Sequence, residues 1–165
     1  MTSEDLVFDI DDIQPPPYQP YHMITNTIAI GDYTTPYEPF DVIFNFNYPQ
    51  NGATFGTIHT TETPEKIIYT IGLLDTTKYT IQLLYIFMEL TPYLAKSKGK
   101  RILFHCYAGI SRSSTAAIMY LMMTTYLSLE AIFRMVLSKR PFIDPNPAFR
   151  RILHICNHKR NIMNT

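Results

Sequence analysis

Hydrophobic positions change their period several times along the chain, and each change marks the start of a new predicted element. Short apolar runs rich in β-branched residues, each closed by a turn signal or a polar residue, predict strands over residues 23–30, 41–46, 66–74 and 101–104. Apolar positions at helical spacing predict helices over residues 79–90, 113–127 and 129–139. Ser128 is the candidate N-cap of the last of these, and Asn146 with Pro147 opens a further helix. The Thr-rich stretch 53–65 has neither period and is expected to form a loop.

Strands and helices alternate from residue 66 onward, which predicts an α/β fold with a mainly parallel central sheet flanked by helices. The length of 165 residues suits a single domain. Residues 1–21 stand apart as an acidic, proline-rich arm, and residues 22–165 are predicted to form the domain. The arm is either a flexible tail or a segment that docks on the basic half of its own chain or on a partner. A homodimer formed through the arm is one option.

Charge is balanced over the whole chain but divided between its two halves. Lys and Arg together number 14, as do Asp and Glu, so the total gives no reason to expect a nucleic-acid partner. Residues 1–95 hold 2 bases and 12 acids, a net charge of −10, and residues 96–165 hold 12 bases and 2 acids, a net charge of +10. A site that binds anions is therefore expected in the C-terminal half.

Two cysteines, Cys106 and Cys156, cannot form a disulfide framework, which favours a reducing, intracellular setting, cytoplasmic or nuclear. No apolar run reaches the 18 or so residues that span a membrane. The N-terminus lacks the basic start and apolar core of a signal peptide. Secretion and a membrane partner are not expected.

The segment Arg101–Thr115, RILFHCYAGISRSST, carries the clearest chemistry of the chain. A predicted buried strand ends at His105 and Cys106, and Arg112 opens the next helix six residues later, with Gly109 in the middle of the connection. A tight loop whose N–H groups converge at a helix N-terminus binds tetrahedral oxyanions. The guanidinium of Arg112 can donate two parallel hydrogen bonds to such an anion.

Cys106 lies in the same positive field, which favours its thiolate form near neutral pH. A thiolate at the base of a phosphate-sized loop faces phosphorus, so the segment predicts nucleophilic displacement through a phosphocysteine intermediate. The plainer alternative makes Cys106 a buried cysteine at a strand end and Arg112 a surface residue that opens a helix. The joint occurrence of His, Cys, Gly, Arg and Ser at this spacing argues against that alternative.

The segment HCYAGISRSS resembles the signature H-C-x-x-G-x-x-R-S/T of cysteine-dependent protein phosphatases. The flanking residues are similar to the dual-specificity subgroup, in order and approximate spacing. These flanking matches are Tyr120-Leu121-Met122, Glu130-Ala131, Arg140-Pro141, Pro145-Asn146 and Phe149. The resemblance covers roughly residues 22–157, and its loop is far more specific than its flanks.

This resemblance implies Cys106 as the nucleophile, Arg112 as the phosphate clamp and Ser113 as the hydroxyl that stabilises the departing thiolate. His105 would shape the loop rather than exchange protons. The residues that would bind the phosphoryl group are Tyr107, Ala108, Gly109, Ile110, Ser111 and Arg112.

Displacement of an alkoxide or phenoxide from phosphorus at neutral pH needs a positioned acid. The upstream candidates are Asp41, Glu62, Glu65 and Asp75. Asp75 follows one predicted strand and Cys106 follows the next, and the helical crossover between them makes these strands parallel, so that both residues come to one edge of the sheet. The family's general-acid aspartate falls at a similar place, which supports Asp75; a solvated loop carboxylate is the alternative.

The implied enzyme hydrolyses phosphotyrosine and phosphoserine or phosphothreonine in proteins, with no cofactor and no metal, and the remaining histidines show no ligand spacing with the cysteines. One alternative is a pseudophosphatase that binds phosphoproteins, although such proteins usually lack the cysteine or the acid. Another is an RNA 5′-triphosphatase of the same superfamily. Its loop usually has Thr-His after the cysteine and Asn before the arginine, where this chain has Tyr107-Ala108 and Ser111.

Overall fold

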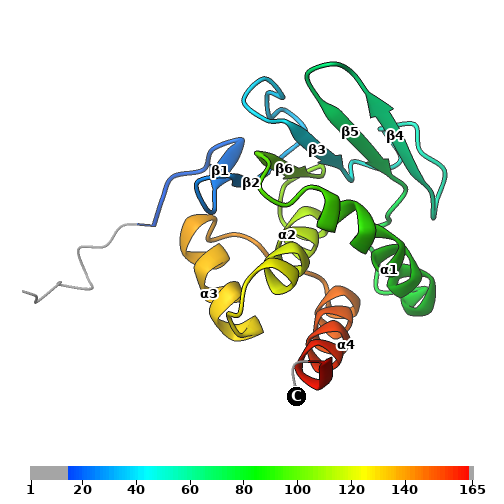
Figure 1. Cartoon of the computed structure of the whole chain (residues 1–165), viewed down its shortest axis with the longest axis vertical. Helices are drawn as coiled ribbons and strands as arrows, with labels where there is room; N and C mark the ends of the chain where they lie inside the picture. Colours follow the sequence, from blue (N-terminus) through cyan, green and yellow to red (C-terminus); the bar gives the residue numbers. More distant parts are fainter. Residues whose placement is uncertain (1–14, 164–165) are drawn as a thin grey trace, which may run out of the picture.

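The structure is a computed structural model that describes the backbone of residues 15–163 and the side chains up to residue 160. In this range the chain forms one six-stranded sheet and four helices (Figure 1). The strands are β1 (Tyr21–Met23), β2 (Ile28–Gly31), β3 (Val42–Asn45), β4 (Ile58–Glu62), β5 (Ile67–Ile71) and β6 (Ile102–His105). The helices are α1 (Thr80–Lys96), α2 (Arg112–Thr124), α3 (Leu129–Lys139) and α4 (Pro147–Met163).

The sheet is mainly parallel, as predicted, with an antiparallel strand at each edge. Its strand order is β1-β2-β6-β3-β5-β4. The four inner strands β2, β6, β3 and β5 run parallel, whereas β1 pairs antiparallel with β2, and β4 with β5. The loops that follow β3, β5 and β6 therefore open on the same edge of the sheet, where open α/β sheets place their ligands.

The four helices gather on one face of the sheet (Figure 1) and bury a large apolar core against it. Alternate residues of β6 divide between the two faces. Ile102 and Phe104 belong to the core under the helices, and Leu103 belongs to a smaller cluster on the opposite face. Phe40 and Tyr37, from the β2–β3 connection, cover that second face. Because β6 is buried on both faces, its sequence reads as a continuous apolar run.

Two of the predicted elements are wrong. The stretch 53–65, expected to be a loop, contains β4, which pairs with β5 at the sheet edge. Most of β4 is exposed, so it shows no hydrophobic alternation, although threonine suits a strand. The predicted strand 23–30 is a hairpin of β1 and β2 instead. In its turn the hydroxyl of Thr25 accepts hydrogen bonds from the N–H groups of Thr27 and Ile28.

The helix predictions are right in number and differ in length. Ser128 caps α3 as predicted, because its hydroxyl accepts from the N–H of Ala131 at 3.1 Å. Helix α1 continues through Pro92, six residues beyond its predicted end, whereas α2 stops at Thr124, three residues before its predicted end. Pro92 lacks the N–H that would bond the carbonyl of the residue four positions earlier. The hydroxyl of Thr91 donates to that carbonyl at 2.7 Å and so allows the helix to continue.

The predicted N-terminal arm is described only from Pro15 onward, and residues 1–14 lie outside the described residues. Its last residues, ahead of β1, contact the domain. The carbonyl of Pro20 accepts from the N–H of Asp32 at 2.7 Å, and the ring of Tyr18 lies 5.3 Å from that of Phe142. This end of the arm is therefore docked on its own chain.

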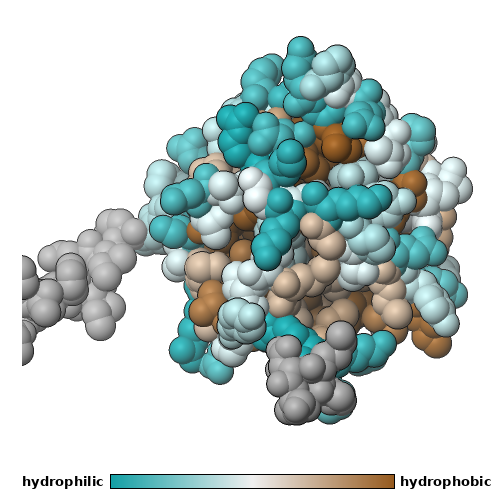
Figure 2. Space-filling view, viewed as in Figure 1, coloured by the Kyte–Doolittle hydropathy of each residue, from teal (hydrophilic) through white to brown (hydrophobic). Residues whose placement is uncertain are grey.

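An apolar groove runs over the region where α1, α2 and α4 meet, visible as light brown surface in Figure 2. Its cavity volume is about 760 Å³, and the methionines that line it are Met88, Met119, Met122 and Met123. Cys156 also lines this groove, as a free thiol. Among the described residues, no helix is both long enough and apolar enough to cross a membrane.

Candidate active site

The loop between β6 and α2 turns its carbonyl groups outward. The carbonyls that accept hydrogen bonds from outside the loop are those of Tyr107, Ala108, Gly109 and Ile110. Tyr33 and Asp144 supply backbone N–H groups to this set, and Arg140 supplies its guanidinium. In the described part of the chain, no backbone N–H from residue 107 to residue 111 donates to a backbone carbonyl. A peptide unit points its carbonyl and its N–H group in opposite directions, so the four outward carbonyls turn the N–H groups of residues 108–111 toward the loop centre. N–H groups that converge in this way bind a tetrahedral oxyanion.

Cys106 lies at the base of this loop, with a side chain that is only 3% exposed. Its Sγ atom is 3.2 Å from the Oγ atom of Ser113, which belongs to the first turn of α2 and is fully buried. A hydroxyl at this distance can donate to a thiolate. The pair predicted from the sequence is therefore in contact.

The guanidinium of Arg112 is anchored through a single nitrogen. Its Nη1 donates to the carbonyls of Phe46 and Tyr48, at 2.8 and 2.9 Å, and more weakly to that of Leu73 at 3.3 Å. Its Nε is buried and has no hydrogen-bond partner among the described residues. A guanidinium held in this way keeps its Nε and Nη2 edge for a bidentate contact with an oxyanion. The plainer alternative, in which Arg112 is a surface residue that opens a helix, is not compatible with a side chain this deeply buried.

We call residues 106–111, between β6 and α2, the phosphate loop. Asp75 comes from the loop after β5 and contacts the phosphate loop directly. Its Oδ1 accepts from the hydroxyl of Ser111 at 2.9 Å and from the side-chain amide of Asn146 at 2.8 Å. The same amide donates to the carbonyl of Thr76, and the backbone N–H of Asn146 donates to the Ser111 hydroxyl. The carboxylate is thus oriented by two loops while it stays exposed to solvent.

The structure leaves the other acid candidates away from this arrangement. Asp41 forms an ion pair with Arg101 at 2.8 Å, and the hydrogen bonds from Arg101 lower the pKa of its carboxyl to about 2. Glu62 and Glu65 are exposed at and beyond the edge strand β4. Of the four upstream carboxylates, only Asp75 contacts the phosphate loop.

His105 is the last residue of β6, directly before Cys106, and is buried, with 3% of its surface exposed. Its Nε2 is 2.6 Å from the hydroxyl of Tyr37. Burial lowers the pKa of His105 to about 4, so its ring is neutral near pH 7. A neutral, buried imidazole at the strand end fits the predicted supporting role better than one in proton transfer.

The sequence pattern assigns no role in the site to two residues that contribute to it, Asn146 and Arg140, although both match the family's flanking residues. Asn146 was expected only to open α4, and it also orients Asp75. Arg140 was noted only beside Pro141, and it binds two loop carbonyls. Both contacts join residues more than 30 positions apart, so no local pattern could have identified them. The rim also carries a stacked pair, Tyr33 and Tyr107, with ring centroids 5.0 Å apart.

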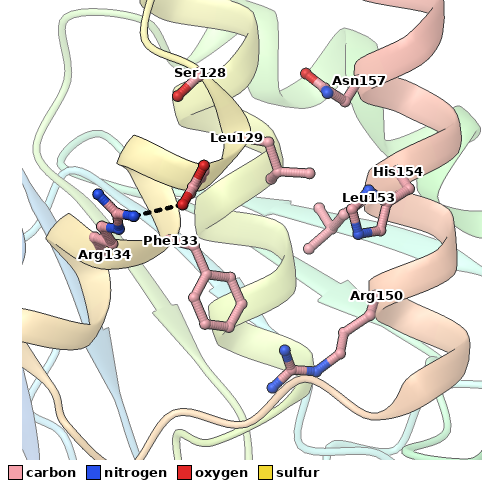
Figure 3. A pocket seen from close by; sticks show the side chains of 9 residues that line it. Ser128, Leu129, Phe133, Arg134, Arg150, Leu153, His154 and Asn157 are labelled. Atoms are coloured by element: carbon pink, nitrogen blue, oxygen red, sulfur yellow. Dashed lines mark hydrogen bonds and ion pairs between the residues drawn. The ribbon is translucent and has the colours of Figure 1, made fainter.

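A second cavity, of about 550 Å³, lies between α3 and α4 (Figure 3). Phe133 and Arg150 line it, with the guanidinium 5.0 Å from the ring, and Arg134 pairs with Glu130 at its side. None of the residues predicted for phosphate chemistry lines this cavity. Among the described residues, no three His, Cys, Asp or Glu side chains lie together in a way that could hold a metal ion.

Comparison with known families accords with this geometry. The model of the dual specificity phosphatase catalytic domain matches residues 37–159, which is most of the chain. The chain therefore belongs to the dual specificity phosphatase catalytic-domain family. The match includes the phosphate loop, Asp75 and Asn146, and it begins after the hairpin of β1 and β2.

Individual similar proteins were found by sequence and by structure. Human dual specificity protein phosphatase 16 is 41% identical over 70 residues, which make up 42% of this chain and 10% of that protein. The crystal structure of human DUSP28 is similar with a TM-score of 0.70 and 21% identity, covering 90% of this chain and 99% of that one. A mouse putative dual specificity phosphatase complexed with zinc tungstate also has a TM-score of 0.70 and 21% identity, with 93% of both chains covered. At this identity the two structures support the fold.

The lowered pKa of His105 predicts how stability depends on pH. The pKa of His105 is 6.5 in the unfolded chain and about 4 in the folded one. The folded state therefore favours the neutral ring, and the free energy of unfolding decreases as pH falls from 6.5 toward 4. The difference amounts to about 3 kcal/mol. We expect the free energy of unfolding of His105→Asn, measured in urea, to fall less than that of the unsubstituted protein between pH 7 and pH 4. The exposed His59→Asn serves as the control, and equal slopes for His105→Asn and the unsubstituted protein would contradict the prediction.

Proposed function

We propose that this chain is a metal-independent, cysteine-dependent dual-specificity protein phosphatase that acts on phosphotyrosine and on phosphoserine or phosphothreonine. The observation that carries the proposal is the orientation of the phosphate loop, with its carbonyls bonded outward and Cys106 beneath its N–H groups. Family membership supports the same conclusion. A mouse member of the fold was crystallised with tungstate, a tetrahedral oxyanion, which is the kind of ligand that this loop would take.

In the first step the Cys106 thiolate attacks phosphorus, and a sulfur–phosphorus bond forms while the ester bond to the leaving oxygen breaks. Asp75 gives its proton to that oxygen. The loop N–H groups and the free edge of Arg112 bind the three remaining phosphoryl oxygens, whose negative charge they stabilise throughout the transfer.

In the second step a water molecule attacks the phosphocysteine, and Asp75, now a carboxylate, takes a proton from this water. The sulfur–phosphorus bond breaks, inorganic phosphate leaves, and the hydroxyl of Ser113, 3.2 Å from Cys106, donates to the departing thiolate. Both steps use one acid–base group, which is held in place by Ser111 and Asn146.

The protein is expected to hydrolyse p-nitrophenyl phosphate, a phosphotyrosyl peptide and a phosphothreonyl peptide in the presence of EDTA, with vanadate as an inhibitor. Cys106→Ser should reduce kcat on the order of 10⁴-fold or more, because the nucleophile is lost. Cys156→Ser is the matched control and should keep its activity, because Cys156 lines the apolar groove of α1, α2 and α4 and contacts none of the proposed catalytic residues by a hydrogen bond. Retained turnover in Cys106→Ser would rule out the nucleophile. Binding of phosphopeptides without any turnover would favour a pseudophosphatase, and preferential release of phosphate from 5′-triphosphorylated RNA would favour the triphosphatase.

Leaving groups of different basicity test the acid. Asp75→Asn should reduce kcat for a phosphothreonyl peptide roughly 10²-fold or more and reduce that for p-nitrophenyl phosphate much less, because an alkoxide needs a proton more than nitrophenolate does. Asn146→Ala, which leaves the carboxylate in place but removes an orienting bond, should show the same preference at roughly 10-fold. Glu65→Gln is the control, since Glu65 is exposed. A larger loss in Glu65→Gln than in Asp75→Asn would show that the acid is misassigned.

The proposed nucleophile must stay reduced, which supports an intracellular location, cytoplasmic or nuclear. Cys106 and Cys156 are both free thiols in the structure. Phosphorylated proteins are the partners that the family implies.

The acidic arm, residues 1–21, remains the proposed contact for a homodimer, supported by the opposite charge of the two halves of the chain and by its five acids with no base. We expect the full chain to dimerise at low salt and a variant that lacks residues 1–14 to be monomeric, as measured by light scattering after gel filtration. The same monomeric mass for both proteins would contradict this role, and dissociation of the full-chain dimer by high salt would support it.

A further inference from the structure

A second guanidinium lies behind the phosphate loop and is completely buried. Arg140, which directly follows the end of α3, has no exposed surface, yet four of its N–H groups have acceptors. Its Nε donates to the carbonyl of Gly109 at 2.9 Å, and its Nη2 donates to that of Ala108 at 3.1 Å. These two consecutive carbonyls lie in the middle of the loop. Arg140 therefore fixes the outward direction of the peptide units whose other side faces the oxyanion.

The remaining nitrogen of Arg140 is bound by the N-terminal segment. Its Nη1 donates to the carbonyl of Gln19 at 2.9 Å and to Nδ1 of His22 at 2.8 Å. The Nε2 atom of the same histidine lies 3.0 Å from the carbonyl of Pro17, which can only accept. These partners fix a neutral ring that donates from Nε2 and accepts at Nδ1, and burial also lowers the pKa of His22. We call residues 15–20, which lead into β1 at the edge of the sheet, the strap (Figure 1).

Aromatic rings and a carboxylate hold the strap in place. The guanidinium of Arg140 lies 4.6 Å from the ring of Phe142 and 5.6 Å from that of Tyr18, so it is enclosed between the domain and the strap. The hydroxyl of Tyr18 donates to Asp32. This carboxylate is therefore bonded to the strap and forms no ion pair with the guanidinium of Arg140. The strap lies outside residues 37–159, the part of the chain that the family model matches.

The charge of Arg140 is not neutralised by a direct partner. All of its hydrogen-bond acceptors are neutral, namely three carbonyls and an imidazole nitrogen, and no carboxylate among the described residues is within ion-pair distance of it. A buried positive charge acts over a longer range than an exposed one because water screens it less. Asp32, which is bonded to Tyr18, offsets part of this charge from a distance, and the remainder adds to the field that an oxyanion meets in the loop.

We propose that Arg140 is a positioning residue for oxyanion binding and that the strap completes its site, so that the docked N-terminal segment controls the affinity of the phosphate loop. Gly109 shows how tight this arrangement is. It has a φ of +67°, and a Cβ atom there would come within 2.6 Å of Nη2 of Arg140 and 2.7 Å of the backbone of Gly31. Without Arg140 and the strap, the peptide units at residues 108 and 109 could turn, and their N–H groups would no longer converge.

The effect on turnover rests on the proposed function, whereas the effect on anion binding does not. The first measurement is therefore the affinity for tungstate, taken from the concentration that protects Cys106 from alkylation by iodoacetamide. Arg140→Met should bind tungstate roughly 10- to 100-fold more weakly than the unsubstituted protein, because a charged, bonded group is lost. Arg140→Lys keeps the charge but not the planar guanidinium that donates to two carbonyls at once, so it should recover part of the loss. Arg134→Met, an exposed arginine inside α3 and six residues before Arg140, is the matched control.

Two deletions isolate the strap. Removal of residues 1–14 should leave tungstate affinity unchanged, whereas removal of residues 1–20 should weaken it roughly 10-fold, since it takes away the Gln19 carbonyl and the Tyr18 ring. Melting temperatures identify any variant that does not fold, and Tyr18→Phe and Tyr18→Ala then provide a milder test of the same contact. Where turnover is present, kcat/KM should fall by one common factor for phosphotyrosyl and phosphothreonyl peptides, because the loop binds the phosphoryl group that both share.

The outcomes separate the two proposals. The inference would be overturned if Arg140→Met bound tungstate as tightly as the unsubstituted protein. It would also be overturned if the variant that lacks residues 1–20 bound tungstate as tightly as the variant that lacks residues 1–14. Either result would hold even for an active phosphatase. Tungstate affinity that follows the expected order in a protein without turnover would support the inference and overturn the proposed function. A loss of kcat/KM for only one class of peptide would indicate that Arg140 contacts the substrate itself and would contradict a positioning role.

Discussion

The orientation of the peptide units between β6 and α2 is the constraint on which this site depends. A carbonyl and an N–H group point in opposite directions from one peptide unit, so each carbonyl that is bonded outside the loop turns an N–H group inward. Here the outside donors are the backbone of Tyr33 and Asp144 and the side chain of Arg140. The oxyanion cradle is therefore not a local property of its own residues. It is imposed by the β2–β3 connection, by the segment before α4 and by the end of α3.

The position of β6 explains why these segments can reach the loop. β6 lies inside the sheet between β2 and β3, so the connections that follow its two neighbours flank the loop at the same edge. β5 is one strand further away, and the loop after it brings Asp75 to the other side of the cradle. Asn146 then spans Asp75 and Ser111 from the start of α4. A parallel arrangement is required, because an antiparallel neighbour would send its connection to the opposite edge.

The sequence alone predicts those features of the structure that are formed by residues close together in the chain. Such local features include the phosphate loop, the cap at Ser128 and the order of strands and helices. The position of Asp75 beside this loop was also predictable, since the crossover rule does not require its strand to be adjacent to β6. β4 was missed because its exposed residues show no alternation, and only pairing with β5 stabilises it. The paired roles of His22 and Arg140 were invisible, because 118 positions separate two side chains that bind each other.

Arg140 is one reason why the uneven distribution of charge along the sequence matters in the structure. The basic C-terminal half supplies two buried guanidinium groups to one loop, and they are anchored in different ways. Arg112 is anchored by carbonyls through one nitrogen and keeps an edge free, which suits a group that binds and releases a ligand. Arg140 has acceptors on all three nitrogens, which suits a group that does not move during turnover. Because one of these acceptors belongs to the strap, the N-terminal segment shares in the geometry of a site whose proposed reacting residues all lie more than 50 positions later in the chain.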